Sequence, residues 1–243
     1  MHRSSPPFKR IMLKLSGEAL MGHHAYGIDP AVLRSVGEEI VSVHAKGIQI
    51  AIVVGGGNIF RGLESSAYGV GRVPADHMGM LATIINALAL GEILVRLGAE
   101  TRIMTAIDMI KIAEPYIRGR ALSHLSKGRI VIFGAGTGNP YFTTDTAAAL
   151  RAMEINADIL LKATKVDGVF DSDPEKNPEA RSFSNLTYRE VLEKGLKVMD
   201  LTAVSLAMEQ DLPIRIFNLK KKGNILRVMA GEDVGTLVTG DLP

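Results

Sequence analysis

The sequence has 243 residues and is 47% apolar, which suits one large α/β domain or two closely joined lobes with a sizeable core. Lysine and arginine total 28 against 26 aspartates and glutamates, and a net charge of only +2 argues against a polyanion-binding surface. There is no cysteine, which excludes disulfides, thiolate catalysis and cysteine-bound zinc.

Neither a secretory signal nor a membrane span is expected. Residues 1–10 are polar, with no apolar segment behind their basic residues. Residues 78–97 form the most apolar stretch, but small, polar or charged residues interrupt it: Gly79, Asn86, Gly91, Glu92 and Arg96. We therefore expect a cytoplasmic protein that binds neither membranes nor nucleic acid.

Short β-branched runs alternate with longer helical patterns along the chain. In chain order we predict a strand at 11–15, a helix at 30–46, a strand at 48–54, a helix at 76–97, strands at 101–105 and 129–133, a helix at 143–156, a strand at 158–162, helices at 188–194 and 200–210, a strand at 214–217, a helix at 224–229 and a strand at 236–239. Start signals support two helices, at Asp29-Pro30 and in the capping box of Thr187 and Glu190. This alternation predicts a three-layer α/β/α sandwich around a mostly parallel sheet.

Two segments leave alternatives open. The predicted helix 76–97 is apolar nearly all round, which fits either burial inside its own subunit or a subunit interface. The polar, turn-rich segment 166–181 could mark a lobe boundary near residue 166, and an unbroken single domain fits the sequence equally well.

Four segments place glycines or polar residues directly after a predicted strand, where ligands bind in open α/β sheets. The first is Lys14 followed by Ser16-Gly17, which suits phosphate binding, although a solvated lysine at a turn is the plainer account. The second is the triple glycine 55–57 followed by Arg61. A tight turn explains one glycine but not three, so we favour a phosphate site that continues into a helix.

The third segment, residues 134–145, combines glycines, hydroxyls and an amide. Helix capping accounts for Thr144 and Asp145 alone, so we favour a ligand site here too. The fourth runs from Lys162 through Lys165 and Phe170 to Asp173, and could hold a purine or be a solvated hairpin.

Several known site motifs are absent from the sequence. There is no G-x-x-x-x-G-K-[ST] motif, which excludes the P-loop nucleotide kinases. The loop 134–139 fails the G-x-G-x-x-G pattern because Asn139 stands at the third glycine, and this weakens a dinucleotide site. The pair His23-His24 fits a solvated loop better than a metal site.

Six runs, in order and spacing, cover nearly the whole chain. They are KLSGEAL at residues 14–20, GGGNIFRG at 55–62, DHMGMLAT at 76–83, GTGNPYFTTD at 136–145, LKATKVDGVF at 161–170 and LKVMDLTA at 196–203. Together they resemble the bacterial UMP kinases of the amino acid kinase family. The first two runs would indicate only the wider family, whereas the third and fourth are specific to UMP kinases.

The resemblance implies phosphoryl transfer from ATP to UMP, giving UDP and ADP in pyrimidine nucleotide biosynthesis. It implies one domain, with a UMP-binding part at about 1–165 and a part at about 166–243 that binds the ATP nucleoside. The implied ATP-binding residues are Lys14, Leu15, Ser16, Gly17, Gly57, Arg61, Thr164, Phe170 and Asp173. The implied UMP-binding residues are Gly56, Asp76, Thr137, Gly138, Asn139, Pro140, Tyr141, Phe142, Thr143 and Thr144, with Asp76 accepting from the ribose hydroxyls.

The resemblance also implies a homohexamer built from dimers, activated by GTP and inhibited by UTP. The segment linked to GTP activation corresponds here to Gly22, His23, His24, Ala25, Tyr26 and Gly27, and its two histidines leave the activator contact open.

The chemistry needs positive charge more than a base, because UMP's phosphate is already mostly a dianion at neutral pH. We expect Lys14, Arg61 and either Lys162 or Lys165 to form a positive cradle, with Mg²⁺ carried by the nucleotide phosphates. Asp145 and Asp200 could orient a lysine or a metal-bound water, and Asp200 could equally be only a helix cap.

Three other functions compete with this one. The nearest is a related kinase that phosphorylates a carboxylate or carbamate. A hydride-transfer enzyme and a non-catalytic nucleotide sensor are the other two.

Overall fold

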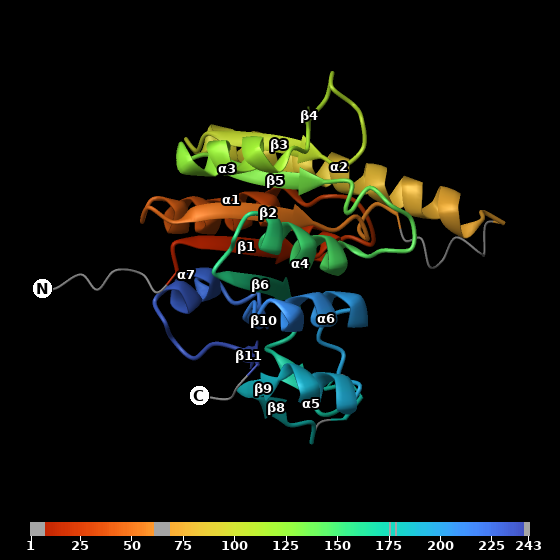
Figure 1. Cartoon of the computed structure of the whole chain (residues 1–243), viewed down its shortest axis with the longest axis vertical. Helices are drawn as coiled ribbons and strands as arrows, with labels where there is room; N and C mark the ends of the chain where they lie inside the picture. Colours follow the sequence, from red (N-terminus) through yellow and green to blue (C-terminus); the bar gives the residue numbers. More distant parts are fainter. Residues whose placement is uncertain (1–7, 61–68, 175, 178, 241–243) are drawn as a thin grey trace, which may run out of the picture.

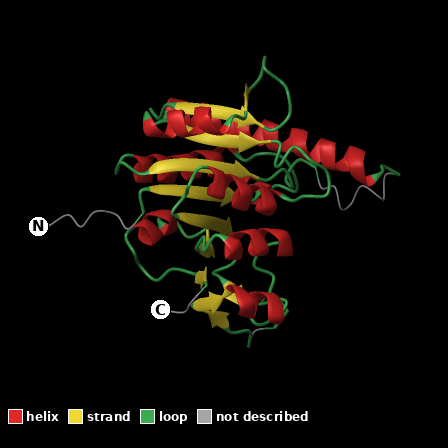
Figure 2. Ribbon diagram, in the orientation of Figure 1, coloured by secondary structure: helices red, strands yellow, loops and turns green. Residues whose placement is uncertain are grey.

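A computed structural model describes residues 8–60, 69–174, 176–177 and 179–240, and Arg61 therefore lies outside the described residues. A sheet of nine strands runs through the described chain, and helices cover both of its faces (Figures 1 and 2). The predicted three-layer α/β/α architecture is confirmed.

The strand order across the sheet is β4-β3-β5-β2-β1-β6-β10-β11-β9, and every pair is parallel except β10 with β11. The strands of this sheet are β1 (Arg10–Leu15), β2 (Gln49–Val54), β3 (Thr101–Thr105), β4 (Glu114–Pro115), β5 (Ile130–Gly134), β6 (Ile159–Thr164), β9 (Asn185–Thr187), β10 (Ile214–Asn218) and β11 (Thr236–Thr239). A separate antiparallel hairpin pairs β7 (Val169–Phe170) with β8 (Ser182–Phe183).

The helices are η1 (Gly17–Leu20), α1 (Pro30–His44), α2 (Arg72–Arg96), α3 (Arg118–Ser126), α4 (Thr144–Glu154), α5 (Tyr188–Glu193), α6 (Leu201–Glu209) and α7 (Asn224–Met229). Both predicted start signals are confirmed, since Asp29 caps α1 and Thr187 forms a capping box with Glu190 at α5. No sequence pattern predicts α3, because its start has no side-chain cap and it buries only Ala121 and Leu125.

Alternate residues of β1 face opposite sides of the sheet, as the strand period requires. Ile11, Leu13 and Leu15 join the core beneath α1, α2 and α7. Met12 joins the core on the other face, beneath α3, α4 and α6. Lys14 has the parity of Met12, so its side chain points toward α4.

One expectation about a helix start was wrong. Helix α2 begins at Arg72, so Asp76 lies in its second turn and is not the first helical residue. The helix expected after the triple glycine stays a prediction, because residues 61–68 lie outside the described residues and Gly56 to Phe60 form a turn.

Helix α2 is half core and half surface. Its inner face packs into the core through Ala87, Leu90 and Leu94. Its outer face exposes large apolar side chains: Met78, Leu81, Ile85, Leu88 and Val95. By length and hydropathy α2 passes the test for a membrane span, yet half of its most apolar window is buried inside the protein, as in the core helix of a soluble domain.

Candidate active site

The four predicted site segments meet at one edge of the sheet. In the parallel register Lys14 lies opposite Val53 on one side and Lys162 on the other, and Val53 lies opposite Phe133. The chain segments that follow β1, β2, β5 and β6 therefore leave the sheet at the same edge, as the sequence predicted.

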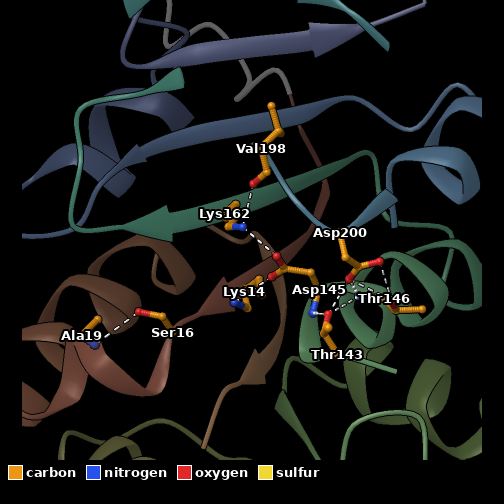
Figure 3. A network of polar contacts seen from close by, with 9 residues as sticks. All are labelled: Lys14, Ser16, Ala19, Thr143, Asp145, Thr146, Lys162, Val198 and Asp200. Carbon is orange, nitrogen blue, oxygen red and sulfur yellow. Dashed lines mark hydrogen bonds and ion pairs between the residues drawn. The ribbon is translucent and has the colours of Figure 1, made fainter. Parts of the chain in front are cut away.

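Register also places two like charges side by side. Lys14 and Lys162 are direct neighbours on adjacent strands, so both side chains point to the same face. Asp145 in the first turn of α4 lies between them, 2.7 Å from Lys14 Nζ through Oδ1 and 2.6 Å from Lys162 Nζ through Oδ2 (Figure 3). Lys162 also donates to the Val198 carbonyl at 2.6 Å.

Burial and charge pull the pKa values of this cluster in opposite directions. Burial alone would raise the pKa of Asp145, but the two ammonium groups outweigh it and hold that pKa below its usual value. Burial lowers the pKa of Lys162, and Lys14 adds to this effect, while Asp145 partly offsets it. The cluster is therefore a carboxylate held ionised by two cations in a nearly dry site.

Asp200 caps two helices at once. Its carboxylate accepts from the Ala203 N–H at the start of α6 at 2.9 Å. It also accepts from the Thr143 hydroxyl, and from the Thr146 N–H and hydroxyl at 3.1 and 2.9 Å, at the start of α4 (Figure 3). Asp200 thus fixes the turn that carries Asp145.

The loop after β1, with Gly17, and the loop after β2, with Gly55, lie too close together to admit side chains at these glycines. A Cβ on Gly17 would lie 2.4 Å from Asn58 Oδ1 and 2.8 Å from the Gly55 carbonyl. A Cβ on Gly56 would meet Ala82 of α2 at 2.8 Å. These glycines let the β1 and β2 loops pack tightly beside Lys14.

A buried amide pair holds the same loops in place. Asn58 and Asn86 donate to each other's carbonyl oxygens at 3.0 and 2.7 Å. Asn86 also donates to the Gly55 carbonyl at 2.7 Å, and Asn58 donates to Gly27 at 2.8 Å. The pair joins α2, the glycine loop and the end of the 22–27 segment.

A pocket opens between the glycine loop, α2 and the loop after β5. It is a shallow pocket that is partly open to solvent. Predicted ligand residues that line it are Gly56, Gly57, Asp76, Thr137, Asn139, Phe142, Thr143 and Thr144. Gly138, Pro140 and Tyr141 belong to the same loop but do not line the pocket.

The loop after β5 has an unusual backbone. Gly136 and Gly138 take left-handed conformations, and so do Ala135 at φ 62° and Tyr141 at φ 72°. Left-handed backbone is unfavourable for residues other than glycine, and it concentrates at functional sites. The Thr83 hydroxyl accepts from the Ala135 N–H at 2.7 Å and helps to hold this conformation.

Two residues predicted to bind ATP after β1, Leu15 and Ser16, have side chains with structural roles. Ser16 caps η1, since its hydroxyl accepts from the Ala19 N–H at 3.2 Å (Figure 3). Leu15 is fully buried in the core, so only its backbone could face a ligand. Its carbonyl accepts from the Gly55 N–H at 2.8 Å.

The residues predicted for the ATP nucleoside lie at the end of β6 and after it, and they do not line the pocket. Thr164 ends β6, Phe170 lies in β7, and Asp173 is about half exposed in the next turn. Lys165 is exposed, so Lys162 is the lysine of this segment that joins the cluster. The structure leaves the roles of Thr164, Phe170 and Asp173 as predictions.

The 22–27 segment is an exposed loop closed at both ends by glycines with positive φ, Gly22 and Gly27. Gly27 exchanges two hydrogen bonds with Asn58, one through its N–H at 2.7 Å and one through its carbonyl. His24 lies 3.7 Å from Asp29, and His23, Ala25 and Tyr26 face solvent.

Sequence reasoning missed four site groups: Thr83, Asn86, Thr146 and the Val198 carbonyl. Asn86 carried a visible signal, because a lone amide inside an apolar helix needs a buried partner. Thr83 lies within the third matching run but was given no role. Thr146 and Val198 act through contacts that no local pattern marks.

The arrangement suits the transfer of an anionic group. Two fixed ammonium groups lie at the strand ends, glycine loops allow close backbone approach, and the pocket beside them carries hydroxyls and a carboxylate. Such a site can bind phosphates and stabilise charge that develops between them.

Comparison with known proteins agrees with this geometry. The family model described as "Amino acid kinase family" matches residues 9–218. The structure of UMP kinase from Bacillus anthracis superposes with a TM-score of 0.94 at 44% identity, covering 97% of this chain and 98% of that one. UMP kinase from Ureaplasma parvum gives 0.90 at 38% identity, covering 95% and 98%.

A more distant structure extends the likeness. Uridylate kinase from Archaeoglobus fulgidus gives a TM-score of 0.74 at 28% identity, covering 94% of this chain and 99% of that one. These relatives match over nearly their whole length, and the family resemblance predicted from the six runs is confirmed. The chain belongs to the amino acid kinase family.

Proposed function

We propose that this chain is an ATP-dependent UMP kinase that forms UDP and ADP in pyrimidine nucleotide biosynthesis. The observation that carries the proposal is the lysine pair Lys14 and Lys162, bridged by Asp145 beside a pocket that Thr144 helps to line. It occurs in a chain 44% identical to a UMP kinase over 97% of its length. The comparisons give no support to a kinase for carboxylates or carbamates.

The lysines of the cluster stabilise negative charge during phosphoryl transfer, and no residue needs to act as a base. The phosphate of UMP has a second pKa of about 6, so it attacks as a dianion and needs no general base. Lys14 and Lys162 supply positive charge where the transferring group passes, and Asp145 holds both in position. Arg61, which follows the glycine loop in the sequence and lies outside the described residues, is proposed as a further cation.

Mg²⁺ fits this site as an ion carried by ATP. The described residues contain no group of three or more His, Asp or Glu placed to hold a metal. Asp145 faces two lysines, and Asp200 is occupied by helix capping. Mg²⁺ bound to the ATP phosphates would neutralise charge on them, which is its usual role in kinases.

The two nucleotides would divide the chain between them. UMP binds in the pocket lined by Gly56, Asp76 and the 137–144 loop, within the part at about 1–165. The ATP phosphates lie over residues 14–17 and Gly57. The ATP nucleoside is held by the part at about 166–243, through Thr164, Phe170 and Asp173.

Assembly and regulation follow the bacterial UMP kinases. The proposal is a cytoplasmic homohexamer, activated by GTP through residues 22–27 and inhibited by UTP. The exposed apolar face of α2 supports burial against another subunit, because such a patch is unusual on a monomer. The bonds from Gly27 to Asn58 give the 22–27 loop a physical route to the glycine loop.

A panel of nucleoside monophosphates with ATP and Mg²⁺, with and without GTP, tests the function. UMP should be the preferred acceptor by a large margin over AMP, GMP and CMP. An acetylglutamate-type carboxylate should give no ADP above background. Turnover of a carboxylate acceptor without turnover of UMP would reject the proposal, and sedimentation would report the oligomeric state separately.

A further inference from the structure

Two donors bond the same oxygen of the Asp76 carboxylate. Arg72 Nε donates to Oδ2 at 2.8 Å, and the Tyr141 N–H donates to Oδ2 at 2.7 Å. Asp76 lines the pocket, whereas Arg72 and Tyr141 do not. Both of these bonds use Oδ2, so neither of them takes up the acceptor capacity of Oδ1.

Arg72 joins the helix start to the pocket loop through two contacts. Its guanidinium bonds Asp76 and lies 5.5 Å from the centre of the Tyr141 ring. Tyr141 is two-thirds exposed and holds a left-handed backbone at φ 72°. The stacked cation and the N–H bond together pin this strained residue against α2.

Helix stability does not explain the Arg72–Asp76 pair. A cation in the first turn opposes the helix dipole, and arginine before aspartate is the less favourable order for a pair four residues apart. The same helix has a pair in the favourable order and position, Glu92 with Arg96 at 2.8 Å. The Arg72 pair therefore points to a role outside the helix.

We propose that Arg72 and Tyr141 are positioning residues that fix the Asp76 carboxylate for ribose and make the site select a sugar with a 2′-hydroxyl. This inference rests on the proposed function. A carboxylate oxygen accepts at two lone-pair sites, so a fixed Oδ1 can take both the 2′- and the 3′-hydroxyl. A deoxyribose leaves one of these sites unpaired, and a site built to bond a hydroxyl rejects the analogue that lacks it.

The test compares UMP with dUMP as acceptors for the wild-type enzyme, Arg72→Ala and the control Arg96→Ala. Arg72→Ala should raise KM for UMP about tenfold and lower the ratio of kcat/KM for UMP over dUMP about fivefold. KM for ATP should not change. Arg96→Ala removes the matched pair on the same helix and should leave all of these values within about twofold of wild type.

The variant Tyr141→Gly gives a second, independent test of the proposal. Glycine keeps the N–H that bonds Asp76 and takes a left-handed backbone without strain, but it removes the ring beneath Arg72. This variant should lower the UMP over dUMP ratio about twofold to threefold. If Arg72→Ala does not fold, this arm and Arg72→Gln decide.

The outcomes separate the two proposals. An enzyme that does not phosphorylate UMP at all rejects the proposed function. An enzyme that uses UMP but does not prefer it over dUMP overturns the inference alone. So does a folded Arg72 variant with the wild-type preference, because a merely structural pair would shift thermal stability and leave the selectivity unchanged.

Discussion

The lysine cluster and the pocket beside it are built in opposite ways. Lys14 and Lys162 stand on adjacent strands, and Asp145 reaches them from the first turn of a helix. All three side chains are nearly buried and in contact. The pocket wall instead is a loop of glycines and hydroxyls with a partly exposed carboxylate, Asp76.

On the proposed function, this difference assigns charge stabilisation to the lysine cluster and substrate recognition to the pocket. Charges that stabilise a transition state act best when they are already fixed in a dry site, since no reorganisation is then needed during the reaction. Recognition of a substrate that enters and leaves needs an accessible loop placed on a rigid scaffold. Mutations in the cluster should therefore affect folding and turnover, and mutations at the pocket should affect selectivity.

The largest effect is expected for Asp145→Asn. This change leaves two nearly buried ammonium groups side by side without their carboxylate, and breaking such a pair costs about 3–5 kcal/mol of unfolding free energy. Urea unfolding at pH 7 measures it. Glu92→Gln, which removes an exposed pair on α2, should cost less than about 0.5 kcal/mol. A loss below about 1 kcal/mol for Asp145→Asn would show that the cluster contributes little.

The loss of stability in Asp145→Asn should also depend on pH. The two lysines hold the pKa of Asp145 below its ordinary value of 3.8 despite burial, which raises it. Its stabilisation is therefore present above pH 3.8 and is lost as the pH falls through the lower folded pKa. The deficit of Asp145→Asn against wild type should be full at pH 7 and shrink below pH 3.8. A deficit that grows with acid would contradict the lowered pKa.

Lys14→Ala should lower kcat at least about a hundredfold, or about 2.7 kcal/mol, while UMP still binds. In the proposed mechanism the lysine acts on charge that develops during transfer, so the loss should fall on turnover more than on binding of the acceptor. Steady-state kinetics with calorimetric binding of UMP would measure both. Lys9→Ala is a suitable control, because the exposed Lys9 contacts Asp158 only through its backbone. Near-normal turnover of Lys14→Ala would count heavily against the assignment.

Much of the cluster's geometry was accessible from sequence. The alternation of apolar runs and helical patterns predicts a parallel sheet, and glycines or lysines after four runs predict where ligands bind. Those inferences need only local patterns and the rule that parallel strands end at one edge. The register that places Lys14 beside Lys162 is a further step, because strand order alone does not fix which residues lie opposite each other.

The contacts that position the residues around the pocket could not be predicted from the sequence. Arg72 and Tyr141 are far apart in sequence, and so are Asp200 and Thr146, and no local pattern pairs them. The start of α2 was placed four residues late because Arg72 and Val73 follow a glycine that offers no side-chain cap. Helix α3 was missed because so few of its residues are apolar and buried. Long-range partners leave no periodic signal in a single sequence.

Asp76→Asn should weaken UMP binding about tenfold and leave ATP binding unchanged. The amide keeps the shape of the carboxylate but loses its charge and half of its acceptor capacity, and it disrupts the bonds from Arg72 and Tyr141. Calorimetric titration with each nucleotide separates the two sites. Equal losses for UMP and ATP would show that Asp76 is misassigned.

The smallest effect is expected where the two regions meet, at Asp200. Asparagine is as good a helix cap as aspartate, so Asp200→Asn should keep the α6 cap and lose less than about 1 kcal/mol of stability. Asp200→Ala also removes the acceptor for Thr143 and Thr146 and should lose about 1–2 kcal/mol. A few-fold fall in kcat for Asp200→Ala that Asp200→Asn largely restores would assign Asp200 to positioning α4. If both variants lost turnover as completely as Lys14→Ala, the Asp200 charge itself would be part of the chemistry, and the separation between a charged cluster and a recognition loop would no longer hold at this residue.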